Sequence, residues 1–171
     1  MDARRESDVA PMKNRTTVER KSERELVFKR TINGPARIVF DAWTKPELMK
    51  RWWAPKSSGA TMLSCEMDVR VGGKYRLVFS HPSAPQPMAF FGRYTEVSPC
   101  SRLVWTNEEG GADREFVTTV TFEEQGGKTT LVVSELHPSK EALDEAMATG
   151  AEGGTLESYD QLEELVASLV A

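Results

Sequence analysis

The stretch TLESYDQLEELVASLV, which spans residues 155–170, decides the fold of this chain. Apolar residues recur in it at spacings of three and four, a pattern typical of a helix with one apolar stripe. The acidic residues lie largely off that stripe, so replacing Glu163 by alanine is expected to cost little stability. We expect Gly153-Gly154 to break the chain just before this helix. The stripe consists of Tyr159, Leu162, Val166 and Leu169.

The middle of the chain is predicted to form a β-sheet that this helix can cover. Between residues 74 and 80, Tyr75, Leu77 and Phe79 alternate with polar residues, which is typical of a strand with one buried and one wet face. The pair Gly72-Gly73 is expected to form a tight hairpin turn. The expected strands span residues 25–32, 61–71, 74–80, 88–97, 102–107, 114–123 and 129–136.

Shorter helices are expected on either side of these strands. Pro35 suits the first turn of a helix over residues 36–43, because its missing N–H would have no partner there. Thr44 and Glu47 have the spacing of a capping box, which predicts a second short helix ending near Trp53. Near the C-terminus, Ser139 is expected to cap another short helix, which Gly150 stops.

These elements together predict an α+β fold. Consecutive hairpins make an antiparallel sheet, and the long helix must bury its stripe on that sheet. The result is a curved antiparallel β-sheet wrapped around a long C-terminal α-helix, with two short helices after the first strand. Such a bent sheet encloses more volume than one helix fills, so an internal hollow is expected.

We expect a single folded domain over residues 24–171, preceded by a flexible arm over residues 1–23. A chain of 171 residues has an ordinary size for one domain. The arm has no aromatic residue, so it cannot bury enough surface to offset the entropy lost on ordering. Its mixed charge leaves a homodimer open as an alternative to a monomer.

Composition and charge exclude several kinds of partner. The formal net charge of -4 argues against binding to nucleic acid. No apolar run approaches the roughly 18 residues of a membrane span, and the N-terminus lacks the apolar stretch of a Sec-type signal peptide. Cys65 and Cys100 are too far apart for a zinc motif and are interpreted as reduced thiols of a cytoplasmic protein.

The sequence predicts no catalytic residue, no cofactor and no metal site. His81 and His137 each precede a proline and are interpreted as solvated histidines at loop entrances, with a general base at a cavity mouth as the alternative. Glu66 and Asp68 share strand parity and are interpreted as part of a wet outer face rather than as an acid–base pair. No metal-ligand spacing and no phosphate loop occurs.

Aromatic residues carry the strongest functional signal. They are spread over almost every expected element, and some of them are expected to line an apolar cavity between sheet and helix. Strand alternation fixes which side chains point inward. The residues expected to line the cavity are Trp53, Tyr75, Leu77, Phe79, Leu103, Trp105 and Tyr159.

Four motifs resemble one known family. They are AWTKPE at 42–47 with Trp52-Trp53, DVRVGGKYR at 68–76, GRYTEV at 92–97 with RLVWT at 102–106, and Gly154, Tyr159, Gln161, Leu162 and Leu165 in the last helix. In this order they resemble the SRPBCC (START/birch-pollen-allergen-like) superfamily. Within it they resemble the group named after the C-terminal domain of the activator of a heat-shock-protein ATPase. The resemblance covers about residues 24–168 and implies a helix-grip fold.

The resemblance implies an internal cavity for apolar small molecules, as in lipid carriers and hormone binders. We therefore expect binding of a small hydrophobic or aromatic molecule rather than catalysis. Two alternatives stay open. One is an enzyme of the polyketide cyclase or aromatase kind acting on a ring substrate. The other is a co-chaperone like the heat-shock ATPase activator, or another stress-response interaction module with a chaperone partner.

Overall fold

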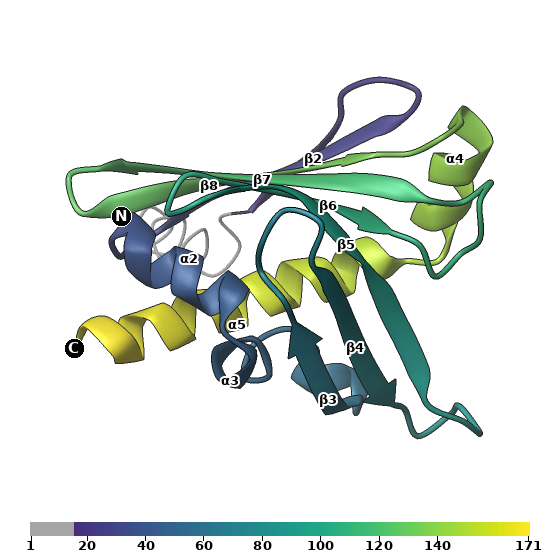
Figure 1. Cartoon of the computed structure of the whole chain (residues 1–171), viewed down its shortest axis with the longest axis horizontal. Coiled ribbons are helices and arrows are strands. Elements are labelled where there is room, and N and C mark those ends of the chain that lie inside the picture. Colours follow the sequence, from purple (N-terminus) through teal and green to yellow (C-terminus); the bar gives the residue numbers. More distant parts are fainter. Residues whose placement is uncertain (1–15) are drawn as a thin grey trace, which may run out of the picture.

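In a computed structural model, which describes residues 16–171, eight strands form one antiparallel sheet. The strand order is β1-β2-β8-β7-β6-β5-β4-β3 (Figure 1). The rest of the expected arm, residues 1–15, lies outside the described residues. The strands are β1 (Thr17–Arg20), β2 (Glu25–Ile32), β3 (Thr61–Met67), β4 (Lys74–Ser80), β5 (Met88–Ser98), β6 (Arg102–Asn107), β7 (Phe116–Gln125) and β8 (Lys128–Leu136).

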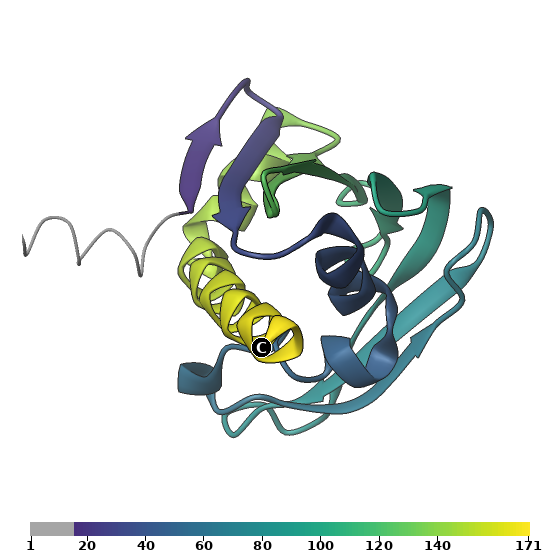
Figure 2. The same ribbon diagram turned by 90° about the vertical axis from the view of Figure 1, so that its left-hand side faces the viewer.

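The longest helix lies in the hollow of this sheet, as the apolar stripe predicts. Figure 2 looks nearly along this helix, α5, and shows the strands curving around it. The α+β fold with a curved antiparallel sheet around a long C-terminal helix is therefore confirmed. The helices are α2 (Ala36–Thr44), α3 (Pro46–Met49), the 3-10 turn η2 (Lys56–Ser58), α4 (Lys140–Ala148) and α5 (Ala151–Val170). Among residues 16–171, no helix combines the length and apolar character needed to cross a membrane.

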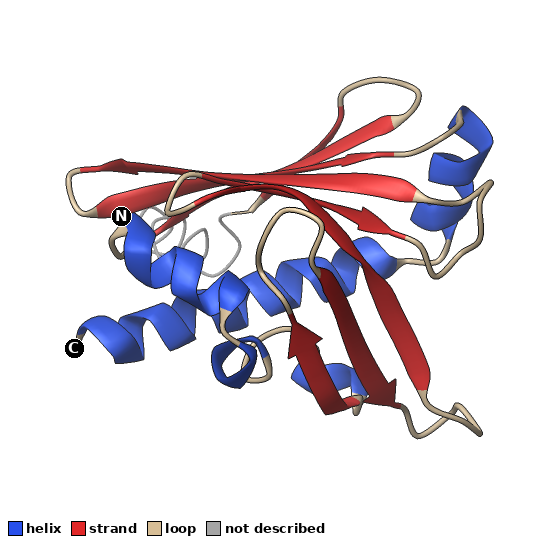
Figure 3. Ribbon diagram, viewed as in Figure 1, coloured by secondary structure: helices blue, strands red, loops and turns tan. Residues whose placement is uncertain are grey.

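The sheet bends along β5, which joins its two parts (Figure 3). The first part of β5 pairs with β4 and the second with β6, and the register with β6 shifts between Tyr94 and Glu96. Such a bulge bends and twists a strand. At Gly92, just before the shift, an added Cβ would lie 2.0 Å from the carbonyl oxygen of Thr106. Only glycine fits this close approach, so Gly92 permits the curvature that makes the sheet concave.

The sheet begins N-terminal to Arg24, the residue at which the sequence places the start of the folded domain. Thr17–Arg20 pair with residues 26–29 of β2 and form an edge strand. Val18 packs partly buried against the core, while its neighbours on β1 are exposed. This strand was not predicted because its sequence is short and polar.

Several predicted boundaries are wrong. Helix α5 starts at Ala151, and the chain turns at Gly150, whose φ of 77° suits glycine, rather than at Gly153-Gly154. Gly154 instead lets the helix approach Pro55, whose Cγ would lie 3.3 Å from an added Cβ.

The predicted capping box of the second short helix does not form. The Thr44 hydroxyl donates to the Phe40 carbonyl, and no side chain caps the start of α3. The first hairpin strand ends at Met67, so its connection to β4 is longer than a glycine turn.

A buried arginine ties α5 to the sheet. Arg30 of β2 has a side chain only 3% exposed, and its guanidinium lies 2.6 Å from both Asp160 Oδ1 and Glu163 Oε1. The expectation that Glu163 contributes little is therefore not supported by its contacts. Such a charge is stable in the interior only while its carboxylate partners remain, since an unpaired buried charge is strongly unfavourable.

The apolar stripe of α5 is buried along most of its length. Leu162 and Val166 are fully buried, and Tyr159 and Leu165 are each 5% exposed. Leu169, which the sequence assigns to the stripe, is 37% exposed near the end of the helix. The stripe therefore runs through Leu165 and ends before Leu169.

We predict that Leu162→Ala lowers the free energy of unfolding by about 2–5 kcal/mol, the usual cost of opening a cavity at a buried leucine. Leu169→Ala serves as the control and should cost clearly less, because its side chain is already partly in water. Urea denaturation of both variants measures the difference. Equal losses would show that the buried face of α5 is wrongly assigned.

We predict that Glu163→Ala costs about 1.5–3 kcal/mol, because it removes the charged hydrogen bonds to Arg30. Glu164→Ala, at the exposed neighbouring position, should stay within about 0.5 kcal/mol of the parent protein. Thermal and urea unfolding of the two variants decide the point. A neutral Glu163→Ala would mean that Asp160 alone satisfies the arginine.

Candidate functional site

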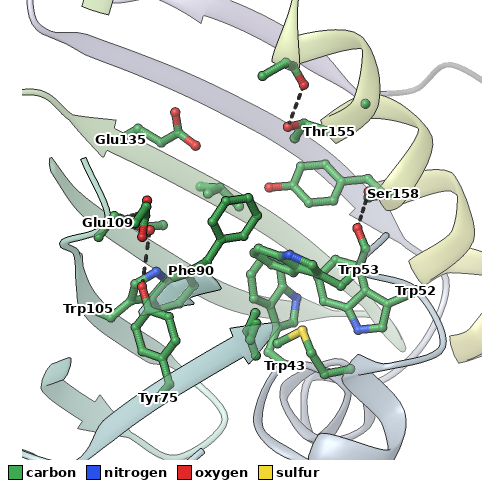
Figure 4. A pocket seen from close by; sticks show the side chains of 18 of the residues that line it. Trp43, Trp52, Trp53, Tyr75, Phe90, Trp105, Glu109, Glu135, Thr155 and Ser158 are labelled. Atoms are coloured by element: carbon green, nitrogen blue, oxygen red, sulfur yellow. Dashed lines mark hydrogen bonds between the residues drawn. The ribbon is translucent and has the colours of Figure 1, made fainter. Parts of the chain in front are cut away.

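A cavity of about 380 Å³ lies between the first half of α5 and the concave face of the sheet. Its walls come from α2, α3 and the loop after it, strands β3 to β8 and the first half of α5 (Figure 4). Exposed lining residues such as Phe90, Glu109 and Ala151 mark its mouth. Its aromatic lining residues are Trp43, Trp52, Trp53, Tyr75, Phe90, Tyr94, Trp105, Phe116 and Tyr159.

Most of the residues predicted to line the cavity do so. Trp53, Tyr75, Leu77, Trp105 and Tyr159 all belong to its wall. They come from three separate elements and one loop, and the fold brings them together.

Phe79 and Leu103 are not part of the wall. Phe79 is 4% exposed and packs against Phe90, with ring centroids 5.3 Å apart, and Leu103 is fully buried in the core. Both have the predicted inward parity, but parity gives the face of a strand and not the position along it. The cavity lies over the far end of β6, beyond Leu103.

Trp43 lies at the centre of the aromatic wall. Its ring centroid lies 4.7 Å from that of Trp52, 5.8 Å from that of Trp105 and 6.1 Å from those of Trp53 and Tyr159. The Trp52 Nε1–H donates to the Ala42 carbonyl at 2.9 Å, which fixes that ring. Pairs at these separations stabilise one another beyond their buried area. The wall is therefore a tightly packed set of rings.

Polar side chains of α5 hold the loop after α3 in place beside the cavity. Gln161 Nε2 donates to the carbonyls of Trp52 and Ala54, and its Oε1 accepts from the Lys56 N–H. The Ser158 hydroxyl donates to the Trp53 carbonyl at 2.7 Å. These bonds satisfy backbone groups of an irregular loop, which would otherwise be costly to bury. They fix Trp52 and Trp53 against the cavity.

The tyrosines of the wall are neutral phenols. Burial raises the pKa of Tyr75, Tyr94 and Tyr159. The Tyr75 hydroxyl already donates to the Thr106 carbonyl at 2.7 Å. None of these side chains is placed to act as a base at neutral pH.

Two carboxylates lie on the cavity wall, and the sequence did not single them out. Glu109 follows β6 and accepts a hydrogen bond from the Phe91 N–H at 3.2 Å. Burial raises the pKa of Glu109, and the nearby charge of Glu108 raises it further. Glu135 lies on β8, with its side chain 25% exposed. The sequence does contain a signal for Glu135. It lies two residues after the buried Val133 and therefore points to the same face of β8.

His137 is buried, so its interpretation as a solvated histidine is wrong. Its side chain is 3% exposed, and its ring stacks on Phe116 with centroids 4.4 Å apart. Its Nε2 lies 3.7 Å from Glu135 Oε1 and has no hydrogen-bond partner among residues 16–171. Spacing in sequence could not reveal the contact with Phe116, which comes from another strand. His81 is partly exposed, contacts Ser83 and does not line the cavity.

The remaining candidates lie apart from any reactive arrangement. Glu66 and Asp68 are exposed, in agreement with a wet outer face. Burial raises the pKa of the Cys65 thiol to about 11, so it is no nucleophile near neutral pH, and Cys100 is exposed. Within residues 16–171, no group of three or more metal-ligating side chains could hold a metal ion.

The chain resembles several solved structures. A protein from Rhodobacter sphaeroides superposes with a TM-score of 0.82 at 23% identity, over 90% of this chain and 99% of that one. A protein from Nitrosomonas europaea gives 0.77 at 25% identity, over 86% and 97%. An AHSA1-like protein from Aeromonas hydrophila gives 0.68 at 20% identity, over 85% and 93%.

No protein with a curated description matches the chain. The family model described as "Activator of Hsp90 ATPase homolog 1-like protein" matches residues 33–167, which is well over half of the chain. The match includes most of the long helix and strands β3 to β8, which are all the strands that line the cavity. The chain therefore belongs to the family of Activator of Hsp90 ATPase homolog 1-like proteins, within the SRPBCC superfamily.

Proposed function

We propose that this protein binds a small, largely apolar organic molecule in the cavity between α5 and the sheet. The observation that carries the proposal is the cavity itself, about 380 Å³ of space inside a wall of packed rings. Ligand pockets usually measure about 300–1,000 Å³ and are mostly apolar with a few polar groups. A cavity of this size is larger than packing defects in ordinary cores, where voids above the size of a water molecule are few.

The wall suits an aromatic or alicyclic body. Trp43, Trp53 and Trp105 offer ring faces and edges, and Leu77 and Val133 offer aliphatic contacts. Removing apolar surface from water contributes about 25 cal/mol per Å² before the costs of association are subtracted. A neutral apolar molecule that fills part of the cavity should therefore bind with a Kd on the order of micromolar, or about −8 kcal/mol.

A specific observation favours a second candidate function, acid–base catalysis on the bound molecule. Glu135 lines the cavity, and the buried His137 lies directly behind it. A carboxylate next to a bound ring can remove a proton from carbon, as cyclase-like reactions require. Interaction with a heat-shock ATPase, and dimer formation through the N-terminal arm, stay predictions.

We predict that the protein binds the neutral dye N-phenyl-1-naphthylamine, with an increase in dye emission and a Kd on the order of micromolar. Thr155→Trp should abolish binding, because Thr155 is a partly exposed lining residue of α5 and a tryptophan there would fill the mouth. Ala167→Trp on the exposed side of the same helix is the control and should bind as the parent does. Equal binding by both variants would place the dye elsewhere on the protein.

The second candidate predicts that the protein accelerates solvent-deuterium exchange at the acidic carbon of 2-tetralone, followed by NMR. Glu135→Gln should reduce that acceleration about 100-fold, since a general base typically contributes this much. Glu164→Gln should leave it unchanged. A parent protein without any acceleration would contradict this candidate and leave the binding function in place.

A further inference from the structure

We propose that the bound molecule carries a positively charged nitrogen, so that the cavity is a site for an organic ammonium ion attached to an apolar body. This inference rests on the proposed binding function and specifies its ligand class. It follows from the charges of the cavity wall, which includes Glu109 and Glu135 but no lysine, arginine or histidine.

The two carboxylates come from different parts of the chain, and both line the cavity. Glu109 follows β6 and Glu135 belongs to β8, and Figure 4 shows both side chains on the left of the view, away from Trp52 and Trp53. Within residues 16–171, neither carboxylate forms an ion pair with a lysine or arginine. Glu109 accepts from a backbone N–H, and Glu135 has only His137 at 3.7 Å.

Several other partly buried carboxylates of this chain are matched by a cation, while two accept hydrogen bonds from serine side chains instead. Asp160 and Glu163 share Arg30 at 2.6 Å, and Glu108, next to Glu109, pairs with Arg93 at 3.1 Å. Glu135 is partly buried, and a charge in such a position without a cationic partner is unfavourable, whereas Glu109 is exposed at the mouth of the cavity. An ammonium group of the ligand would supply the cation that Glu109 and Glu135 lack.

The aromatic wall supports the same charge. A cation within about 6 Å of a ring centroid is attracted by the negative face of tryptophan, tyrosine or phenylalanine. Tyr75, Phe90 and Trp105 belong to the same cavity wall as the two carboxylates (Figure 4). A negatively charged ligand should bind poorly, because an anion in this cavity would face two carboxylates without a compensating cation.

The inner part of the wall is apolar. Trp43 is 2% exposed and packs there against Trp52, Trp105 and Tyr159. The ligand is thus an amine whose charged nitrogen lies toward the two carboxylates and whose ring system lies against these aromatic side chains.

Isothermal titration calorimetry with three ligands that share one body tests the proposal. They are 2-naphthylmethylamine, which is a cation at pH 7, 2-naphthalenemethanol, which is neutral, and 2-naphthoate, which is an anion. The amine should bind the parent protein about tenfold more tightly than the alcohol, and the naphthoate at least about tenfold more weakly. Glu109→Gln and Glu135→Gln should each reduce the ratio of amine to alcohol affinity by about threefold or more, and together they should remove the preference. Glu164→Gln, at an exposed site far along α5, should keep the parent ratio.

The outcomes separate this inference from the function on which it rests. An alcohol that binds as tightly as the amine, or a ratio unchanged in both glutamine variants, would overturn the cation site and leave the binding function standing. Failure of all three ligands to bind would overturn both. Melting temperatures close to the parent value verify that the variants are folded, as expected for isosteric changes at partly exposed side chains.

Discussion

The attachment of α5 to the sheet is the constraint on which the rest of the structure depends. The part of the helix from Asp160 onward is held tightly, by the buried Leu162 and Val166 and by the Arg30 ion pairs to Asp160 and Glu163. The preceding part spans a sheet that curves away from it along β5. The space between is only partly filled by rings, so the cavity is a consequence of how one straight helix crosses a bent sheet. Stability and the binding site therefore reside in different parts of the same helix.

Much of the fold could be predicted from the sequence, because strand alternation and the helical stripe are local patterns. Inward parity correctly identifies Tyr75, Leu77 and Trp105, but the same argument includes Phe79 and Leu103, which lie beyond the cavity. Which part of a strand faces open space depends on tertiary packing. Gly153-Gly154 lies inside α5 rather than at a break, and the contact that explains Gly154 is with Pro55, a residue distant in sequence.

The polar part of the site was the least predictable. Glu135 follows Val133 on the buried face of its strand, and a charged residue in such a position is a usable signal. Glu109 lies in a turn after β6, where no periodicity applies, and only the fold brings it to the cavity. The family match explains the architecture but not the ligand, because one fold supports many functions. The chemistry of the wall, apolar rings with two carboxylates, carries the functional argument instead.

The most direct test of the central claim is native mass spectrometry of the protein isolated from its own organism without denaturation. The account predicts a species heavier than the bare chain, whose extra mass is a small organic molecule that unfolding releases. Release of that molecule should leave a protein that takes up a neutral apolar dye. Detection of the bare chain alone, together with no uptake of the dye by that protein, would contradict the account.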